Sequence, residues 1–537
     1  MKKFIYILLF LFAFSACDEN FLDRTPYDAI SSSTIWENDD NAEMAITGIY
    51  NTFHGTFVNN PLNFGRFGSD GANFSGGGYE QNLTTAWDGN FSGYYQNFYR
   101  MINYANDAIV NLDGNENITP ELAKRWIAEA KFARAISYFF LKTLYGDVVI
   151  LDKPVLPEET YLERSPVSQV KQLIVDDLTY AIDNLPVSYD ASDNGRFTSG
   201  AAIALLGKLY LYDEEYPKAA DEFKKLMQEP YSYALVDEYA DLFSFKTEDN
   251  SEVVLTVKCI MENGMGAPYD VRYGGRSVNA SGWTNSVATW ITMNAYSNSD
   301  GTEIDWSDMP QLEDYASDYE YGLDLIPWYK TKFENVDKRL HANVIVPGYT
   351  FVGNDNVEFV VNWPYNEHAS DPVPAYRTNW PNVALFPWRK FVTPGEDNIM
   401  RWHSPTDIPL IRYADVLLMY AEAANEEGMT ADALAALNTV RNRAEIPELS
   451  GLDSDALRTA IRMERLREFP GEGILFFDQL RWRTAHTDDP VFGLNHEVLD
   501  FRGKTLWKRE FTEKSYLWAI PQAEIDLNDK LTQNPGW

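Results

Sequence analysis

The strongest constraint on the fold is a series of amphipathic segments whose apolar residues recur every three or four positions. Residues 119–146 are the clearest case. Thr119 and Pro120 are typical of a helix start, Gly146 is typical of a helix end, and the apolar residues between them form one stripe. Residues 165–186 repeat this plan, with a Ser-Pro start and a second apolar stripe. Both segments predict long helices with one buried face.

Two further segments predict helices that occur in pairs. Residues 199–228 contain two helical patterns with a break near Tyr216, and residues 414–444 contain two more around Gly428. Pairs of antiparallel helices joined by short turns are typical of tetratricopeptide-like repeats, although the period here is imperfect. We therefore expect a mainly α fold in which helix pairs form a curved scaffold.

The middle of the chain lacks this regularity. Residues 229–404 are rich in Pro, Asn, Gly, Trp and Tyr. Their short possible strands are residues 252–258 and 357–363. We expect residues 41–537 to form a single domain, with a helical scaffold at about 41–228 and 405–537 and a loop-rich ligand-binding insertion at about 229–404. Residues 59–92, rich in Gly, Asn and Ser with interspersed aromatics, predict a second long loop region.

The N-terminal region predicts export and lipidation. Two lysines and a short apolar run over residues 1–16 are typical of a secretory signal, and this run is too short to span a bilayer. Cys17 follows small residues at the expected cleavage point, which resembles the bacterial lipobox. We expect a cleaved signal at residues 1–16, a lipidated Cys17 and an extended tether over residues 17–40. The alternative is an ordinary signal peptide with an incidental cysteine. Lipidation of Cys17 leaves Cys259 without an intrachain disulfide partner.

The charge balance narrows the possible partners. The formal net charge is −35, from 45 basic and 80 acidic residues. Nucleic-acid binding needs clustered Lys and Arg, and the sequence has no such cluster. The same charge disfavours polyanionic ligands unless a local basic patch overrides it, so it favours a neutral ligand. Solubility is the simpler explanation of the charge itself.

Motifs of common enzyme classes are missing from the sequence. It has no HExxH, no GxSxG and no phosphate-binding GxxxxGK[ST], and its six histidines show no ligand spacing. Residues 297–308 resemble a calcium loop only faintly, because they lack Asp at the first position and Glu at the twelfth. We expect no catalytic residues, no bound metal and no cofactor. A glycosidase pair of carboxylates among 80 acidic residues is not excluded by pattern alone.

Long stretches of the chain resemble the SusD/RagB family, and they occur in the family's order. These stretches are residues 130–151, 164–186, 195–212, 408–426, 433–444, 461–482 and 517–537. The resemblance implies a surface-exposed outer-membrane lipoprotein of Bacteroidetes that is not an enzyme. It implies binding of a glycan, or in a minority of the family a peptide. It also implies a partner, a SusC-like TonB-dependent barrel transporter on which the protein sits as a lid.

Family ligand sites lie in the early loop and in the mid-chain insertion, but their residues vary with the ligand. A carbohydrate site needs an exposed aromatic plane and nearby polar groups. The candidate glycan-binding residues are Asp70, Asn73, Tyr79 and Trp87 in the early loop, and Tyr273, Arg276, Asn279 and Trp283 in the insertion. The alternative for each aromatic is packing in the core, which is slightly favoured for Trp283 and more strongly for Trp87, because a helix pattern follows Trp87.

Two classes of function stay open at this point. The first is a surface glycan-binding lipoprotein that delivers its ligand to a transporter, with peptide capture at the same place as a narrower alternative. The second is a surface carbohydrate-active enzyme on a helical scaffold. A polysaccharide panel separates the two classes, because retention without new reducing ends supports binding.

Overall fold

The computed structural model describes residues 34–73, 79–156, 159–278, 282–365, 374–379, 382–397, 400 and 402–537. The predicted signal peptide and Cys17 therefore lie outside the described residues. Residues 36–40 of the predicted tether are part of the folded domain, because Trp36 is buried and helix α2 begins at Asp39. No helix in these ranges combines the length and apolar character needed to cross a membrane.

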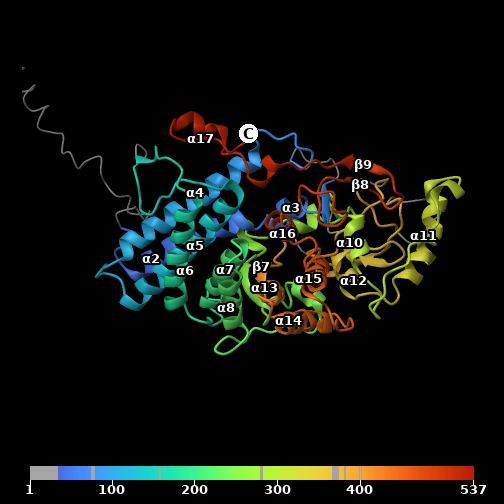
Figure 1. Cartoon of the computed structure of the whole chain (residues 1–537), viewed down its shortest axis with the longest axis horizontal. Helices are drawn as coiled ribbons and strands as arrows, with labels where there is room; N and C mark the ends of the chain where they lie inside the picture. The colour runs from blue at the N-terminus through green and yellow to red at the C-terminus, as the bar shows by residue number, and fades with distance from the viewer. Residues whose placement is uncertain are drawn as a thin grey trace, which may run out of the picture.

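The helices of the N-terminal half lie side by side (Figure 1), and each packs against the next along the chain. They are α2 (Asp39–Phe57), α4 (Gly89–Leu112), α5 (Pro120–Tyr145), α6 (Val167–Asn184), α7 (Ser199–Tyr212) and α8 (Tyr216–Leu226). The stripe predicted for α5 is largely buried, and Gly146 ends the helix with a left-handed φ of 75°. α7 and α8 approach closely at Gly207, where a Cβ would overlap the ring of Phe223. The structure confirms the predicted mainly α fold.

The C-terminal helices continue the scaffold and contact the insertion. They are α13 (Tyr413–Glu426), α14 (Thr430–Arg443), α15 (Ser454–Glu468), α16 (Leu475–Arg481) and α17 (Gln522–Leu527). α13 packs on α7, α8, α14 and α15, and the predicted turn between α13 and α14 contains Gly428 with φ 74°. In Figure 1, α13, α14, α15 and α16 lie between the N-terminal stack and the yellow insertion, whereas α17 lies above α4; α15 contacts α10 and α12 of the insertion.

The insertion is built from short elements. Its helices are η2 (Tyr239–Phe243), η3 (Glu262–Gly264), α9 (Tyr269–Arg272), α10 (Trp290–Ala295), η4 (Leu312–Asp314), α11 (Asp318–Lys332), α12 (Arg339–Asn343), η5 (Asn354–Asn356) and η6 (Gly395–Asp397). Its strands are β2 (Val253–Val257), β3 (Ser286–Ala288), β4 (Thr350–Val352), β5 (Glu358–Val360) and β6 (Phe386–Pro387). β2 and β5 fall within the two predicted strands, and β4 pairs antiparallel with β5.

Small sheets tie the insertion to the rest of the chain. β2 pairs antiparallel with β7 (Ile408–Arg412), and β3 lies between β1 (Gly71–Asn73) and β6, with Gly71 opposite Ala288. β8 (Glu497–Leu499) pairs with β9 (Thr505–Lys508). The region predicted as one long loop at residues 59–92 therefore contains β1, and also helix α3 (Asn60–Gly65), which has proline in its first turn. The loop prediction is wrong here because strand pairing with β3 is a tertiary effect that local composition does not report.

A buried network of charges lies where the insertion meets the C-terminal helices. Arg339 pairs with Glu464 at 2.7 Å and with Glu468 at 2.9 Å, and Arg412 pairs with Glu468 at 2.9 Å. We call the whole set the junction network: Asp337, Arg339, Lys390, Glu252, Arg412, Arg441, Arg443, Glu464, Glu468 and Glu472. Buried charges are tolerated only when they are paired in this way. One hydrophobic cluster surrounds the network and includes side chains from Trp36 to Leu531.

Candidate functional site

An exposed pair of tryptophans lies at the surface of the insertion. The rings of Trp283 and Trp402 are almost perpendicular, at 88°, and their centroids are 5.0 Å apart. The guanidinium carbon of Arg272 lies 5.2 Å from the ring centroid of Trp283 and 5.5 Å from that of Trp402. Trp283 is 38% exposed and Trp402 is half-buried. We call these three residues the tryptophan platform.

The backbone around Trp283 fixes its position. The chain folds back so that the Trp283 N–H donates to the carbonyl of Val271 at 2.6 Å, next to Arg272 at the end of α9. Gly282 permits this fold, because a Cβ there would overlap the carbonyl of Gly274. Trp283 and Arg272 therefore face each other through backbone pairing, without depending on the tip of a free loop.

Trp402 comes from a different segment that is fixed to the same support. Ala267 and Ser404 form a β-bridge, with N–H···O distances of 2.7 and 2.9 Å. Gly266 allows this close approach, since a Cβ there would overlap the backbone of His403. Ala267 lies two residues before α9, so the segments that carry Trp402 and Arg272 are held together.

The platform is cationic. Burial lowers the pKa of Arg272, and the nearby charge of Arg66 lowers it further, yet a guanidinium stays protonated at neutral pH. Among the described residues, no carboxylate is a cause of the shift in the Arg272 pKa, and the Nε atom of Arg272 is buried without a hydrogen-bond partner. The two indole faces stabilise its charge by a cation–π interaction worth about 0.5–2 kcal/mol.

This arrangement suits the capture of a ligand that is apolar on one side and polar on the other. An indole face offers rigid apolar contact area, and the guanidinium offers N–H donors beside it. Sugar rings combine a face of C–H groups with a rim of hydroxyls, so they match both features. None of the three side chains titrates near neutral pH, and therefore the platform supplies no general acid or base.

Three of the predicted site residues lie in the core and are corrected here. Asp70 is buried and accepts a hydrogen bond from the Gly471 N–H at 2.8 Å, and its burial raises its pKa to about 6. Tyr79 is buried and donates to the carbonyl of Ser515 at 2.7 Å. Tyr273 is buried and donates to the carbonyl of Gly471 at 3.2 Å. Their polar atoms tie the early loop and α9 to the C-terminal part of the chain, so they are not available to a ligand.

The other predicted residues are dispersed. Arg276 is exposed, near the platform in sequence, and Asn73 belongs to strand β1. Trp87 is 67% exposed, which contradicts the favoured prediction that it packs in the core. It lies beside α17, because the carbonyl of the residue before it accepts a hydrogen bond from the first residue of α17. Asn279 lies outside the described residues.

Sequence reasoning predicted Trp283 and missed its two neighbours in the platform. Trp402 meets the criterion applied to Trp283, since it is an aromatic residue in an irregular, proline-containing segment. Arg272 stands one residue before Tyr273, within the predicted segment. No local signal in the sequence pairs residue 272 with residue 402, because the β-bridge between Ala267 and Ser404 brings them together.

Comparison with known proteins identifies the fold and the family. The model of the SusD family matches residues 251–537, and a second model, described as starch-binding and associating with the outer membrane, matches residues 20–211. A SusD-like protein of Formosa agariphila, P25, is 26% identical over 565 residues, covering 99% of this chain and 97% of that protein.

Solved structures share the fold. A SusD-like protein of Bacteroides fragilis superposes with a TM-score of 0.79 at 22% identity, covering 96% of this chain and all of that one. A laminarin-binding SusD-like protein superposes with a TM-score of 0.67 at 23% identity, covering 93% and 100%. Because the SusD family model spans more than half of the sequence, and the fold agrees, the chain belongs to the SusD family.

Proposed function

We propose that this protein is a surface-exposed glycan-binding lipoprotein. It captures oligo- or polysaccharide on the tryptophan platform and delivers it to a SusC-like TonB-dependent transporter of the outer membrane. The observation that carries the proposal is the perpendicular pair of the exposed Trp283 and the half-buried Trp402, with Arg272 over both rings. SusD family members are carbohydrate-binding proteins without catalytic activity, so the chain is a binding protein and not an enzyme.

The relatives support a glycan as the ligand. One of the two matching family models is described as starch-binding, and one of the similar structures binds laminarin. Starch and laminarin are glucans with different linkages, so the ligand class is shared while the linkage varies. An indole face tolerates such variation, because stacking depends on a C–H face more than on one hydroxyl pattern.

An apolar surface beside α17 supports the proposed transporter partner. Leu83, Trp87 and Leu527 are 70%, 67% and 69% exposed. α17 connects Trp87 with Leu527, because the N–H of Gln522 at its start donates to the carbonyl of Ala86 and Leu527 is the last residue of this six-residue helix. Leu83 lies four residues before Trp87. Exposed apolar side chains gathered in this way are typical of protein–protein interfaces. We place Trp87 in this partner surface and remove it from the glycan site.

Lipid anchoring remains part of the proposal. Cys17 lies outside the described residues, and the argument for its lipidation is its position after a signal-like apolar run. Two or more acyl chains on one residue give stable membrane attachment. Mass spectrometry of the protein extracted from its membrane tests this step, because a lipidated N-terminal cysteine adds the mass of the acyl chains.

The binding proposal is tested by calorimetry of residues 18–537 against a panel of neutral and acidic glycans. We expect Trp283→Ala and Trp402→Ala each to weaken binding by about 5- to 150-fold, the equivalent of about 1–3 kcal/mol for losing one stacked ring. Trp87→Ala is the matched control, because it removes an exposed tryptophan from another surface. Unchanged binding by both platform variants with their fold intact would remove the platform from the proposal, and a ligand that gains reducing ends would contradict the non-catalytic assignment.

A further inference from the structure

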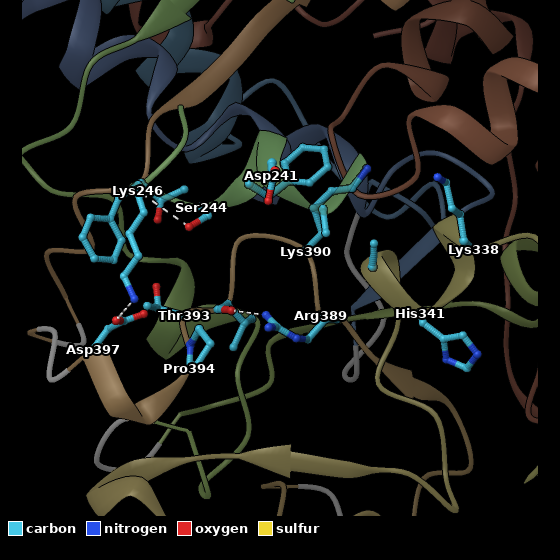
Figure 2. Close-up of a pocket in the computed structure, with 16 residues that line it drawn as sticks. Asp241, Ser244, Lys246, Lys338, His341, Arg389, Lys390, Thr393, Pro394 and Asp397 are labelled. Carbon is cyan, nitrogen blue, oxygen red and sulfur yellow. Dashed lines mark hydrogen bonds and ion pairs between the residues drawn. The ribbon is translucent and has the colours of Figure 1, made fainter. Parts of the chain in front are cut away.

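A cavity lies beside the chain on either side of the segment that carries Trp402, because Asp397 and Thr406 both line it. Its volume is about 470 Å³, and it lies between η2 and residues 389–397 (Figure 2). Residues 392–397 form one of its walls, and the chain continues through Trp402 and returns to the cavity at Thr406. α9 links the two places, because Asp270 of α9 accepts a hydrogen bond from the Thr393 N–H at 2.7 Å. The cavity and the platform therefore share their supporting segments.

The lining of this cavity reverses the charge balance of the protein. Its cationic residues are Lys246, Lys338, Arg389 and Lys390, whereas its acidic residues are Asp241 and Asp397. The whole chain has 80 acidic and 45 basic residues. Charges at the surface are screened within about 8 Å at physiological ionic strength, so a ligand inside the cavity interacts chiefly with these local cations.

The cations differ in how firmly they are held. Lys390 is buried against Glu472 at 2.8 Å and belongs to the junction network. Arg389 donates to the carbonyl of Val392 at 2.5 Å and lies over the ring of Phe351, so its position in the middle of the cavity is fixed. Arg389 is therefore the fixed cation of the cavity, whereas the charge of Lys390 is neutralised by Glu472.

The two remaining lysines lie near opposite ends of the cavity in Figure 2 and are partly exposed. Lys246 pairs with Asp397, and its side chain is 54% exposed. Lys338 pairs with Glu445 at 2.8 Å, where the glutamate is 76% exposed. Only one member of each pair is largely exposed, because the Asp397 side chain is 11% exposed and the Lys338 side chain 29% exposed. Solvent therefore screens each pair in part, and a bound anion competes for the lysine.

The other lining groups suit a sugar ring. Phe243 and Phe245 are half-buried aromatic residues of the wall, and the hydroxyls of Ser244, Thr393 and Thr406 also line the cavity. Aromatic surface with nearby hydroxyls binds pyranose rings, as on the platform. Guanidinium and ammonium groups bind carboxylate and sulfate by charge-assisted hydrogen bonds. The two sets of groups occur together in one hollow.

We propose that this cavity is a second saccharide subsite that binds the anionic group, carboxylate or sulfate, of an acidic sugar. The inference rests on the proposed glycan-binding function and names a ligand class for it. The proposed acidic ligand differs from the neutral ligand that the net charge of the chain favours, because the local basic patch overrides that charge. The platform then binds the neutral faces of a glycan, and the cavity selects glycans that contain acidic sugar units.

The test measures calorimetric affinity for matched sets of hexose, hexuronate and 6-sulfated hexose in the gluco, galacto and manno series. We expect at least one acidic sugar to bind about tenfold or more tightly than its neutral counterpart, since hydrogen bonds to charged groups contribute about 1.5–3 kcal/mol. The preferred charged group, carboxylate or sulfate, distinguishes uronate-containing from sulfated glycans. Raising the salt concentration should weaken this preference.

Variants assign the preference to the cavity. Lys246→Met with Lys338→Met keeps the aliphatic chains and removes both rim charges, and we expect it to abolish the tenfold preference. Arg389→Met is the second variant, and Lys225→Met is the matched control, because Lys225 is 47% exposed and pairs with Glu222 on the distant scaffold.

Each outcome is decisive. The subsite is overturned if the preference for the acidic sugar survives the lysine variants, or if no series shows such a preference. The proposed function still stands in that case if the wild-type protein binds a neutral polysaccharide and Trp283→Ala loses this binding. Inorganic sulfate that binds as tightly as the sulfated sugar shows a general anion site and overturns the assignment to a saccharide. If the wild-type protein binds no glycan of either panel, both the proposed function and the subsite are contradicted.

Discussion

Replacing Glu468 by Gln tests whether the junction network holds the insertion on the scaffold. The Glu468 carboxylate contacts Arg339 and Arg412 at 2.9 Å each and Arg443 at 2.5 Å, and all four side chains are buried. Gln has nearly the same shape but no charge, so three guanidinium groups lose a shared counter-ion in a region closed to water. Removing one partner of a buried ion pair costs about 3–5 kcal/mol.

The expected change in melting temperature follows from the size of the protein. The entropy of unfolding is about 2.1 cal/mol/K per residue, so about 500 ordered residues give about 1 kcal/mol/K. A loss of about 3–5 kcal/mol therefore lowers Tm by about 3–5 °C. Differential scanning calorimetry of wild type and Glu468→Gln measures this difference.

A pH series adds a signature that a packing defect would not produce. Burial alone would raise the pKa of Glu468, but Arg443, Arg412 and Arg339 hold it well below its ordinary value of 4.5. A carboxyl with a depressed pKa stabilises the folded state above its unfolded pKa, and this contribution is lost as the pH falls. The difference in Tm between wild type and variant should therefore shrink as the pH drops below about 4.5.

The matched control is Glu513→Gln, which removes a carboxylate that pairs with Arg483 at 2.7 Å on the surface. Both side chains of that pair are more than half exposed, so its Tm should change by less than about 1 °C. A Glu468→Gln protein as stable as this control, or a Tm difference independent of pH, would refute the reasoning.

Three further predictions concern the binding surfaces and one buried carboxyl. Arg272→Met should weaken glycan binding by roughly fivefold in calorimetry, because it removes the donors of the platform and leaves both rings. Trp87→Ala should leave glycan affinity unchanged and reduce co-purification with the transporter, and the opposite pattern would return Trp87 to the glycan site. Burial raises the pKa of Asp270 to about 7, so its stabilising contribution is lost as the pH rises through that value. Wild type should therefore lose about 1 kcal/mol of stability between pH 6 and pH 8 relative to Asp270→Asn, as measured by urea unfolding, and parallel pH profiles would contradict this.

The scaffold could be predicted from sequence because its determinants are local. In α5, apolar residues three and four positions apart share one face, and Pro120 and Gly146 each mark one end of the helix. The same reasoning located α13, α14 and the turn at Gly428. These predictions needed no knowledge of distant partners.

The site could be predicted only in part, because its geometry depends on contacts between distant residues. Tyr273 and Trp283 come from the same irregular segment, yet one is buried and the other is exposed. An irregular segment has no period that separates its two faces, so composition suggested both residues equally. The burial of Tyr273 depends on a hydrogen bond to Gly471, nearly two hundred positions away. Local sequence carries no trace of that pairing, nor of the cations that line the cavity.

The junction network limits how new specificity can be transferred to this protein. Arg339 and Lys390 of the insertion pair with Glu464, Glu468 and Glu472 of the C-terminal helices, so a chimera that exchanged the whole insertion would strand buried charges on both sides of the graft. The tips that carry Trp283 and Trp402 lie outside the network. Grafts confined to these tips would leave every ion pair of the junction network in place, so the proposed glycan site could be exchanged without exposing an unpaired buried charge.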